Sequence, residues 1–249
     1  MTARQLLAVV FVSLVMAPAV WAQDTQSIVF GAFYRCNQAT EARTDTIYQE
    51  VMAPIFQKHV DAGHLTAYGW NRHRMGGAWR RLSYVVGTDL DAMLDAQTAY
   101  IEEFQRDHAE AVREFNTICS SHDDYIWYRV AGSQAPEEVA QERPNAGLSS
   151  YMVCDSREAE ADEIMETAFA PILNGHVESG RISSWLWLEH NVGGWYRRAL
   201  VLDAADYKTI LNYWNTVWQD IEAEQPELLR EFGAICDSHQ DYVWDLSVR

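Results

Sequence analysis

Apolar and polar residues follow two different periods along this chain, and their alternation predicts strands separated by helices. The strand-like segments are short and rich in β-branched and aromatic residues: 27–35, 65–73, 79–87 and 123–130. Residues 44–60 place Ile47, Val51 and Ile55 four apart, with Gly63 just beyond, which predicts an amphipathic helix and its end. Apolar residues at spacings of three and four from 88 to 119 predict a second, longer helix.

The same pattern occurs twice in the chain. The stretch HRMGGAWRR at 73–81 returns as HNVGGWYRR at 190–198, and the register holds without a gap from Ala53/Ala170 to Trp127/Trp244. Two units of this size indicate a duplicated domain and not a solenoid. We expect one repeat at 28–130, a second at 148–246, and between them a linker at 131–147 that is rich in Pro, Gly and Glu.

Within a repeat, the order strand–helix–strand–strand–helix–strand is that of a ferredoxin-like βαββαβ unit, with sheet order 4-1-3-2 and both helices on one face. The pair Gly76-Gly77 suits a tight hairpin, and Pro226 predicts that the long helix is broken in the second repeat. Segments 185–190 and 197–203 are apolar on both faces, so the other face of the sheet must also be covered. The predicted fold class is therefore α+β, with two tandem ferredoxin-like units packed sheet to sheet as an intramolecular α/β barrel.

This arrangement resembles the dimeric α/β-barrel superfamily, fused here into one chain. The resemblance covers residues 28–246 in element order and duplication, and it points to NIPSNAP-type, antibiotic-biosynthesis-monooxygenase-type and chlorite-dismutase-type proteins. It implies a barrel that is complete in one chain, hence a monomer. The superfamily includes haem enzymes, cofactor-free oxygenases and proteins of unknown role, so the fold does not select a function.

The first 22 residues do not belong to either repeat. Arg4, an apolar run and the sequence Val20-Trp21-Ala22 are typical of a signal peptide cleaved near Ala22, the alternative being an uncleaved membrane anchor. We therefore expect a periplasmic or secreted protein. The 36 acidic and 19 basic residues give a net charge of −17, which predicts no binding to nucleic acid and, after signal cleavage, none to anionic membranes.

The four cysteines are expected to pair within repeats, because an exported chain meets an oxidising compartment. Tracing the strand directions puts Cys36 and Cys119 at the same end of the first unit, and Cys154 and Cys236 at the same end of the second. The topology therefore predicts the disulfides Cys36–Cys119 and Cys154–Cys236.

Two histidines, His73 and His190, flank the repeated hairpins and are the candidates for a catalytic role. An imidazole there could act as a haem ligand, a general base or a donor to a substrate, and the alternative is a structural histidine satisfied by a backbone carbonyl. Pairing of strand 2 with strand 4 of the other unit could bring His73 near His239, but we expect no metal site.

Further residues predicted to bind a ligand gather at the same end of the barrel: Arg80, Arg81, Arg197, Arg198, His122 and His239. Trp70 and Trp187 are predicted to bind the ligand as well. One arginine of each pair should point inward, where it needs either a carboxylate, such as Asp124 or Asp241, or an anionic ligand. Most of the tryptophans are expected in the core and the barrel lining.

These features predict an exported tandem α/β barrel that binds a small, partly apolar molecule in a Trp-lined cavity, and the arginines would suit an anionic group on it. One alternative is an oxygenase of the α/β-barrel type, either haem-dependent or cofactor-free, with His73 or His190 as ligand or base. The other is a non-catalytic structural or interaction module. No phosphate loop, nucleophile elbow or zinc-protease motif is present, so enzyme activity stays open, as does the cofactor, with haem as the candidate.

Overall fold

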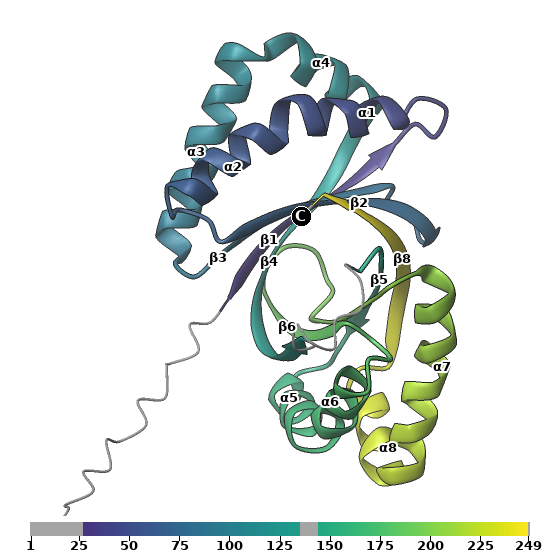
Figure 1. The fold of residues 1–249 in the computed structure, drawn as a ribbon. Helices are drawn as coiled ribbons and strands as arrows, with labels where there is room; N and C mark the ends of the chain where they lie inside the picture. Colours follow the sequence, from purple (N-terminus) through teal and green to yellow (C-terminus); the bar gives the residue numbers. More distant parts are fainter. Residues whose placement is uncertain (1–26, 135–143, 249) are drawn as a thin grey trace, which may run out of the picture.

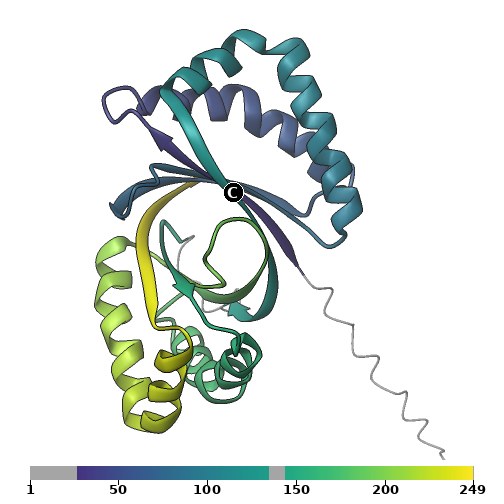
Figure 2. The same ribbon diagram turned by 180° about the vertical axis from the view of Figure 1, so that it is seen from behind.

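The computed structural model describes residues 27–134 and 144–248, which form a closed eight-stranded barrel with helices on its outside (Figures 1 and 2). We call residues 27–134 the first half and residues 144–248 the second half. The predicted signal peptide, residues 1–22, lies outside the described residues. In both views the helices of the two halves lie on opposite sides of the barrel.

The two halves contain matching elements. In the first half these are β1 (Ile28–Cys36), α1 (Ala42–Ile47), the π-helical η1 (Tyr48–Met52), α2 (Ala53–Asp61), β2 (Ala67–Gly76), β3 (Arg81–Gly87), α3 (Leu90–Asp107), α4 (Ala109–Ile118) and β4 (Cys119–Gln134). In the second half they are β5 (Ala146–Val153), α5 (Glu158–Ile164), the π-helical η2 (Met165–Phe169), α6 (Ala170–Glu178), β6 (Ser184–Val192), β7 (Arg198–Ala204), α7 (Tyr207–Glu224), α8 (Pro226–Ile235) and β8 (Ser238–Val248).

The strand order around the barrel is β1-β3-β2-β8-β5-β7-β6-β4. Each half therefore has the predicted 4-1-3-2 order, as β4-β1-β3-β2 and as β8-β5-β7-β6, and the predicted fold class is confirmed. The two seams are antiparallel pairs between the halves, β2 with β8 and β4 with β6. The seam strand β4 continues to Gln134, and β5 begins at Ala146. Both strands therefore overlap the predicted linker 131–147, whose residues 135–143 lie outside the described residues.

Both predicted disulfides, Cys36–Cys119 and Cys154–Cys236, are present. Each joins the end of the first strand of a half to the end of its last helix, as the strand directions required. Paired cysteines are what an oxidising compartment produces. Among the helices of the described residues, none is long and apolar enough to cross a membrane.

The long helix predicted over 88–119 is broken in the first half as well as in the second, which the sequence did not indicate. The second half breaks at Gln225, before Pro226, but the first half breaks at His108 without a proline. At His108 the backbone leaves the helical region, with φ −133° and ψ 28°, and α4 turns back to pack against α1. This turn brings Cys119 to Cys36, so tertiary packing and the disulfide outweigh local helix propensity there.

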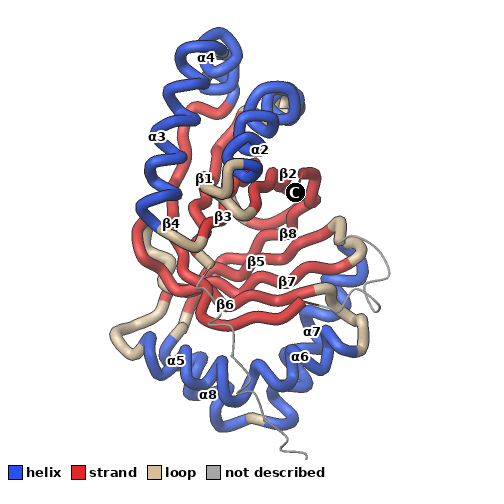
Figure 3. The backbone as a smooth tube through the Cα atoms, turned by 60° about the vertical axis from the view of Figure 1, so that its left-hand side comes forward, coloured by secondary structure: helices blue, strands red, loops and turns tan. Residues whose placement is uncertain are grey.

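Aromatic rings fill the inside of the barrel. The helices cover its outside (Figure 3). The buried residues of the interior come from both halves: Phe33, Trp79, Leu82, Tyr125, Trp127, Tyr151, Leu188, Ala199, Tyr242 and Trp244. Trp70 and Trp187 are also fully buried, but they pack in the two cores between sheet and helices. The prediction that tryptophans form core and barrel lining therefore holds for these residues, which divide between the two faces of the sheet. It is wrong for Trp195, which is exposed.

Candidate functional site

The double arginine of the first half is held by carboxylates at the start of α1, on the outer face of the barrel. Arg81, whose side chain is 5% exposed, donates from Nε and Nη2 to the two oxygens of Asp45 at 2.6 and 3.0 Å. Arg80 donates to both oxygens of Glu41 at 2.8 and 2.7 Å. Trp70 adds an indole N–H bond to Asp45 at 2.8 Å. Both guanidinium charges are already paired with carboxylates of the protein. This favours a structural role of the two arginines over the binding of an anionic ligand.

The second half repeats this cluster, and there the buried arginine, Arg198, binds two carboxylates. Arg198 contacts Asp162 at 2.6 Å from Nε and from Nη2, and it donates from Nη1 to Glu158 at 2.8 Å. Arg197 donates to Glu158 at 2.8 Å, and Trp187 donates to Asp162 at 2.8 Å. We therefore regard Arg197 and Arg198 as structural residues as well.

The carboxylates expected to pair with the arginines, Asp124 and Asp241, do not do so. Asp124 lies 3.3 Å from Nε2 of His122, and Asp241 lies 3.4 Å from Nε2 of His239. The reason is topological: β1 lies between β3 and β4, so the arginines and these aspartates are two strand spacings apart, about 10 Å. The acids of α1 and α5 pack directly over the arginines instead.

His73 and His190 belong to the same two clusters. Nδ1 of His73 lies 2.7 Å from Nη1 of Arg80, and Nδ1 of His190 lies 2.8 Å from Nη1 of Arg197. A guanidinium can only donate, so in each ring Nδ1 accepts and Nε2 carries the hydrogen. Burial, followed by the adjacent guanidinium, lowers the pKa of both histidines, which keeps the rings neutral at pH 7. Nδ1 of each ring is occupied by the guanidinium, and each ring also lies against a backbone carbonyl of its hairpin, Gly76 or Gly193, which favours the structural alternative for both histidines.

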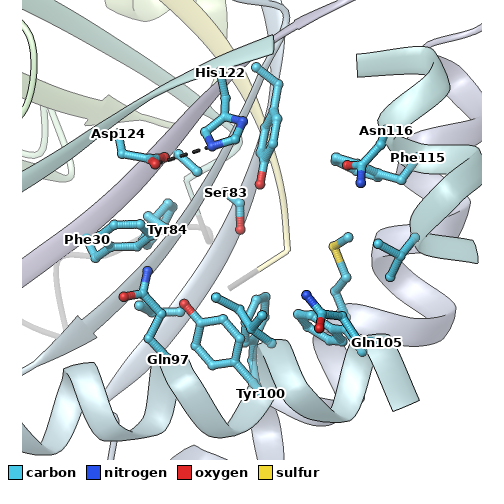
Figure 4. Close-up of a pocket in the computed structure, with 18 residues that line it drawn as sticks. Phe30, Ser83, Tyr84, Gln97, Tyr100, Gln105, Phe115, Asn116, His122 and Asp124 are labelled. Atoms are coloured by element: carbon cyan, nitrogen blue, oxygen red, sulfur yellow. Dashed lines mark ion pairs between the residues drawn. The ribbon is translucent and has the colours of Figure 1, made fainter. Parts of the chain in front are cut away.

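A cavity of about 310 Å³ lies in the first half between the outer face of the sheet and helices α3 and α4 (Figure 4). Its apolar walls include Phe30, Met52, Phe56, Val85, Ile101, Phe104, Val112 and Phe115. Its polar residues are Tyr34, Ser83, Tyr84, Gln97, Tyr100, Gln105, Asn116, His122 and Asp124. Such an apolar pocket with a few convergent polar groups is the usual form of a small-molecule site.

The His122–Asp124 pair forms the polar end of this cavity. Both residues come from β4, and Figure 4 shows their side chains facing each other across one wall, with Ser83 beside them and Gln97 and Tyr100 opposite. Burial raises the pKa of Asp124, although the neighbouring His122 acts against the shift. A histidine oriented by a carboxylate is the arrangement of a general base, because the carboxylate stabilises the imidazolium that forms.

Burial also raises the pKa of the two phenols that line the cavity, Tyr34 and Tyr100. Both therefore stay protonated at neutral pH and can donate a hydrogen bond to a ligand oxygen. The cavity thus holds donors along its walls and a proton acceptor at one end.

The second half has a different cavity at the corresponding place. A groove of about 370 Å³ is lined by Trp214 and Trp218, which stand where the first half has Gln97 and Ile101. Leu200 replaces Ser83 at the corresponding position of the strand. His239 reaches the groove but its partner Asp241 does not line it. The polar set around a His–Asp pair is therefore complete in the first half only.

The residues of the first-half cavity do not fit haem. His122 is the one histidine that lines it, and its Nε2 is engaged by Asp124. The volume of about 310 Å³ is at the lower end of what small organic ligands occupy, and a porphyrin is larger. Within residues 27–134 and 144–248, no three His, Cys, Asp or Glu side chains are grouped so as to hold a metal ion.

Comparison with solved structures shows the fold. An anthrone oxidase-like protein superposes with a TM-score of 0.58 at 12% identity, covering 91% of this chain and 94% of its own. A protein assigned as a monooxygenase from Fusobacterium nucleatum gives 0.58 at 8% identity, covering 90% and 94%. A variant chlorite dismutase from Candidatus Nitrospira defluvii, in complex with cyanide, gives 0.54 at 8% identity, covering 90% and 92%.

The chain thus has the dimeric α/β-barrel fold, and the superfamily resemblance expected from the sequence is confirmed at the level of the fold. No protein-family model matches the sequence. No curated protein matches it either.

The structure separates the residues that the sequence grouped into one site. Of that set, only His122 lines the first-half cavity and only His239 lines the second-half groove, while the arginines, Trp70, Trp187, His73 and His190 form the two outer clusters. Sequence reasoning missed Ser83 and Gln97. The available signal was a polar residue within an apolar period, at a position where the other repeat is apolar or aromatic.

Proposed function

We propose that the protein binds one small, mostly aromatic molecule in the first-half cavity, with the polar end of the molecule against His122 and Asp124. The observation that carries this proposal is the His–Asp pair, half exposed, at the polar end of an apolar cavity of about 310 Å³. The sequence had suggested an anionic ligand held by arginines. None lines this cavity, so a neutral molecule with a hydroxyl or an enolisable carbonyl fits better.

The His122–Asp124 pair also supports a second candidate function, a cofactor-free oxygenase. A base that removes a proton beside a carbonyl or from a phenol leaves an electron-rich anion, which can react with dioxygen. The likeness to an anthrone oxidase-like protein suggests anthrone as the test substrate. Its reaction with one dioxygen gives anthraquinone and one water. In this reading His122 accepts the proton and Asp124 stabilises the imidazolium.

Binding is tested by isothermal titration calorimetry with 2-naphthol and with anthrone. The variant Gln97→Trp introduces the residue that the second half carries, Trp214, and should weaken binding by at least about tenfold because the indole occupies the cavity. Leu94→Ala, on the same helix but outside the cavity, is the matched control and should bind like the wild type. Equal affinity of Gln97→Trp and wild type would place the ligand elsewhere.

Oxygenase activity is tested with a dioxygen electrode in the presence of anthrone. Replacing His122 by Gln should lower the turnover rate by about a hundredfold or more, the usual contribution of a general base, with binding little changed. If the wild type binds anthrone but does not consume dioxygen above the rate in buffer, the protein is a binding protein and not an oxygenase.

We further propose that the chain is exported and that residues 1–22 are removed. The two disulfides support this, because structural disulfides persist in oxidising compartments. Mass spectrometry of the protein from cell fractions tests it: the expected species is periplasmic or secreted and starts near Gln23. A full-length species in the cytoplasm would contradict export.

A further inference from the structure

Another cavity, of about 500 Å³, lies at the end of the barrel where the β2–β3 and β6–β7 hairpins turn. Both halves build it: Arg35 and Trp79 come from the first, Trp195 and Tyr196 from the second. The hairpins fold closely over the barrel strands, since a Cβ on Gly77 or Gly194 would clash with the hydroxyl of a tyrosine beneath. Residues of both repeats therefore form this cavity, which we call the barrel mouth, whereas the first-half cavity is formed by one repeat.

The aromatic part of the mouth combines a fixed floor with one exposed indole. Trp79 stacks on Tyr242 with ring centres 4.9 Å apart and an angle of 18° between the planes, and both are buried. Trp195, at the rim, is 76% exposed, and the first repeat has Ala78 at the corresponding position. A single exposed aromatic residue is ordinary. Here the indole borders a cavity that already contains ordered polar groups.

The polar groups of the mouth are held in place by the protein. Asp123 Oδ2 accepts from Arg35 at 2.6 Å and from Trp79 Nε1 at 2.7 Å, so Oδ1 keeps acceptor capacity. Gln240 Oε1 accepts from the hydroxyls of Tyr196 and Tyr242 at 2.7 and 3.2 Å. Carboxylate, guanidinium, amide and phenol thus offer both donors and acceptors, already oriented around one space.

The charge of the mouth selects the class of ligand. Arg35 and Asp123 neutralise each other, so neither a cation nor an anion finds an uncompensated partner there. The net charge of −17 disfavours an anion further. What remains is a neutral molecule with an apolar face for the indole and several hydroxyls for the polar groups, which describes a sugar ring. We infer that the barrel mouth is a saccharide-binding site, with Trp195 as the stacking platform and Asp123, Arg35 and Gln240 as hydrogen-bonding partners.

The inference is tested on the full chain by isothermal titration calorimetry with maltotriose, cellotriose and triacetylchitotriose. At least one trisaccharide should bind saturably with a Kd of about 1 mM or below. Trp195→Ala, which gives the second hairpin the residue of the first, should weaken that binding by about tenfold or more at an unchanged melting temperature. Asp123→Asn should weaken it as well. Gln97→Trp, which fills the other cavity, should bind the sugar like the wild type.

Two outcomes would overturn the inference. One is the absence of saturable binding for all three trisaccharides. The other is binding that Trp195→Ala leaves unchanged, because the sugar would then sit elsewhere. Since Gln97→Trp affects only the first-half cavity, failure at the mouth and failure of the proposed small-molecule site give different patterns.

Discussion

The arginine clusters allow a sharp test of whether Arg81 and Arg198 are structural. The substitution is Asp45→Asn in the first half and, separately, Asp162→Asn in the second. Both substitutions keep the shape of the side chain and remove the negative charge that pairs with a buried guanidinium. Each arginine side chain is only 5% exposed, so water cannot replace the lost partner.

The two substitutions should differ in cost because the remaining partners differ. In the first half the second carboxylate, Glu41, lies 3.4 Å from Arg81, which is too long for a strong bond. We expect a loss of about 3 kcal/mol in the free energy of unfolding, the lower end for breaking a buried pair. In the second half Glu158 lies 2.8 Å from Arg198 and stays bonded, so the loss should be about 1.5 kcal/mol, that of one charge-assisted hydrogen bond.

The assay is thermal unfolding followed by circular dichroism. For a chain of this size, these values correspond to melting temperatures lowered by roughly 6–12 °C and 3–6 °C. Asp107→Asn, which removes an exposed partner of Arg106, is the control and should leave the melting temperature unchanged. If Asp45→Asn costs no more than this control, the carboxylate does not hold Arg81, and the arginine is available to an anionic ligand after all.

Three further predictions concern the disulfides and the titrating groups. Replacing Cys36 and Cys119 by Ala should lower the free energy of unfolding by about 4.5 kcal/mol, from the chain-entropy relation for a sequence separation of 83 residues. Urea unfolding under oxidising conditions, with the wild type alongside, measures this loss. A loss under 1 kcal/mol would show that the disulfide does not stabilise the protein by restraining this loop. The pKa of Asp124 is raised in the folded protein, so the protonated carboxyl stabilises the fold below the unfolded-state pKa of about 3.9. This stabilisation is lost as the pH rises through the folded-state pKa. The variant Asp124→Asn should therefore be more stable than the wild type at pH 7 and equally stable near pH 3. Equal stability at both pH values would refute that assignment. The lowered pKa values of His73 and His190 make the wild type lose stability as pH falls below about 6.5, and a double change to Asn should flatten this acid limb in urea titrations; an unaltered limb would mean that other groups cause it.

The repeat in the sequence predicted most of the fold. Once the two units align from Ala53 to Trp127 and from Ala170 to Trp244, the element order gives the ferredoxin-like sheet order, and the apolar second face of the strands gives the barrel. Strand direction then pairs the cysteines. The break at His108 did not follow, because it depends on how α4 packs against α1. The π-helical turns η1 and η2 were missed too, although a proline lies just after each of them and removes a backbone donor.

The candidate site was harder to predict because one strand has two faces. The sequence predicts Arg80, Arg81 and His73 at one end of the sheet, with one arginine of the pair pointing inward. In the structure both arginines turn outward to Glu41 and Asp45 at the start of α1. The carboxylates that bind the arginines lie at the start of α1 and α5, about 36–40 residues earlier in the chain. Only the folded structure shows that they contact the arginines. Comparing the two repeats position by position, as at Gln97 and Trp214, would have located the cavity better than comparing their shared residues.

The most direct test of the proposed site is the crystal structure of the protein soaked with 2-naphthol. We predict density for the ligand in the first-half cavity between α3 and the sheet, with its hydroxyl within hydrogen-bond distance of His122 or Asp124. Density in the groove beside Trp214 and Trp218 instead, or a first-half cavity left without ligand at saturating concentration, would contradict it.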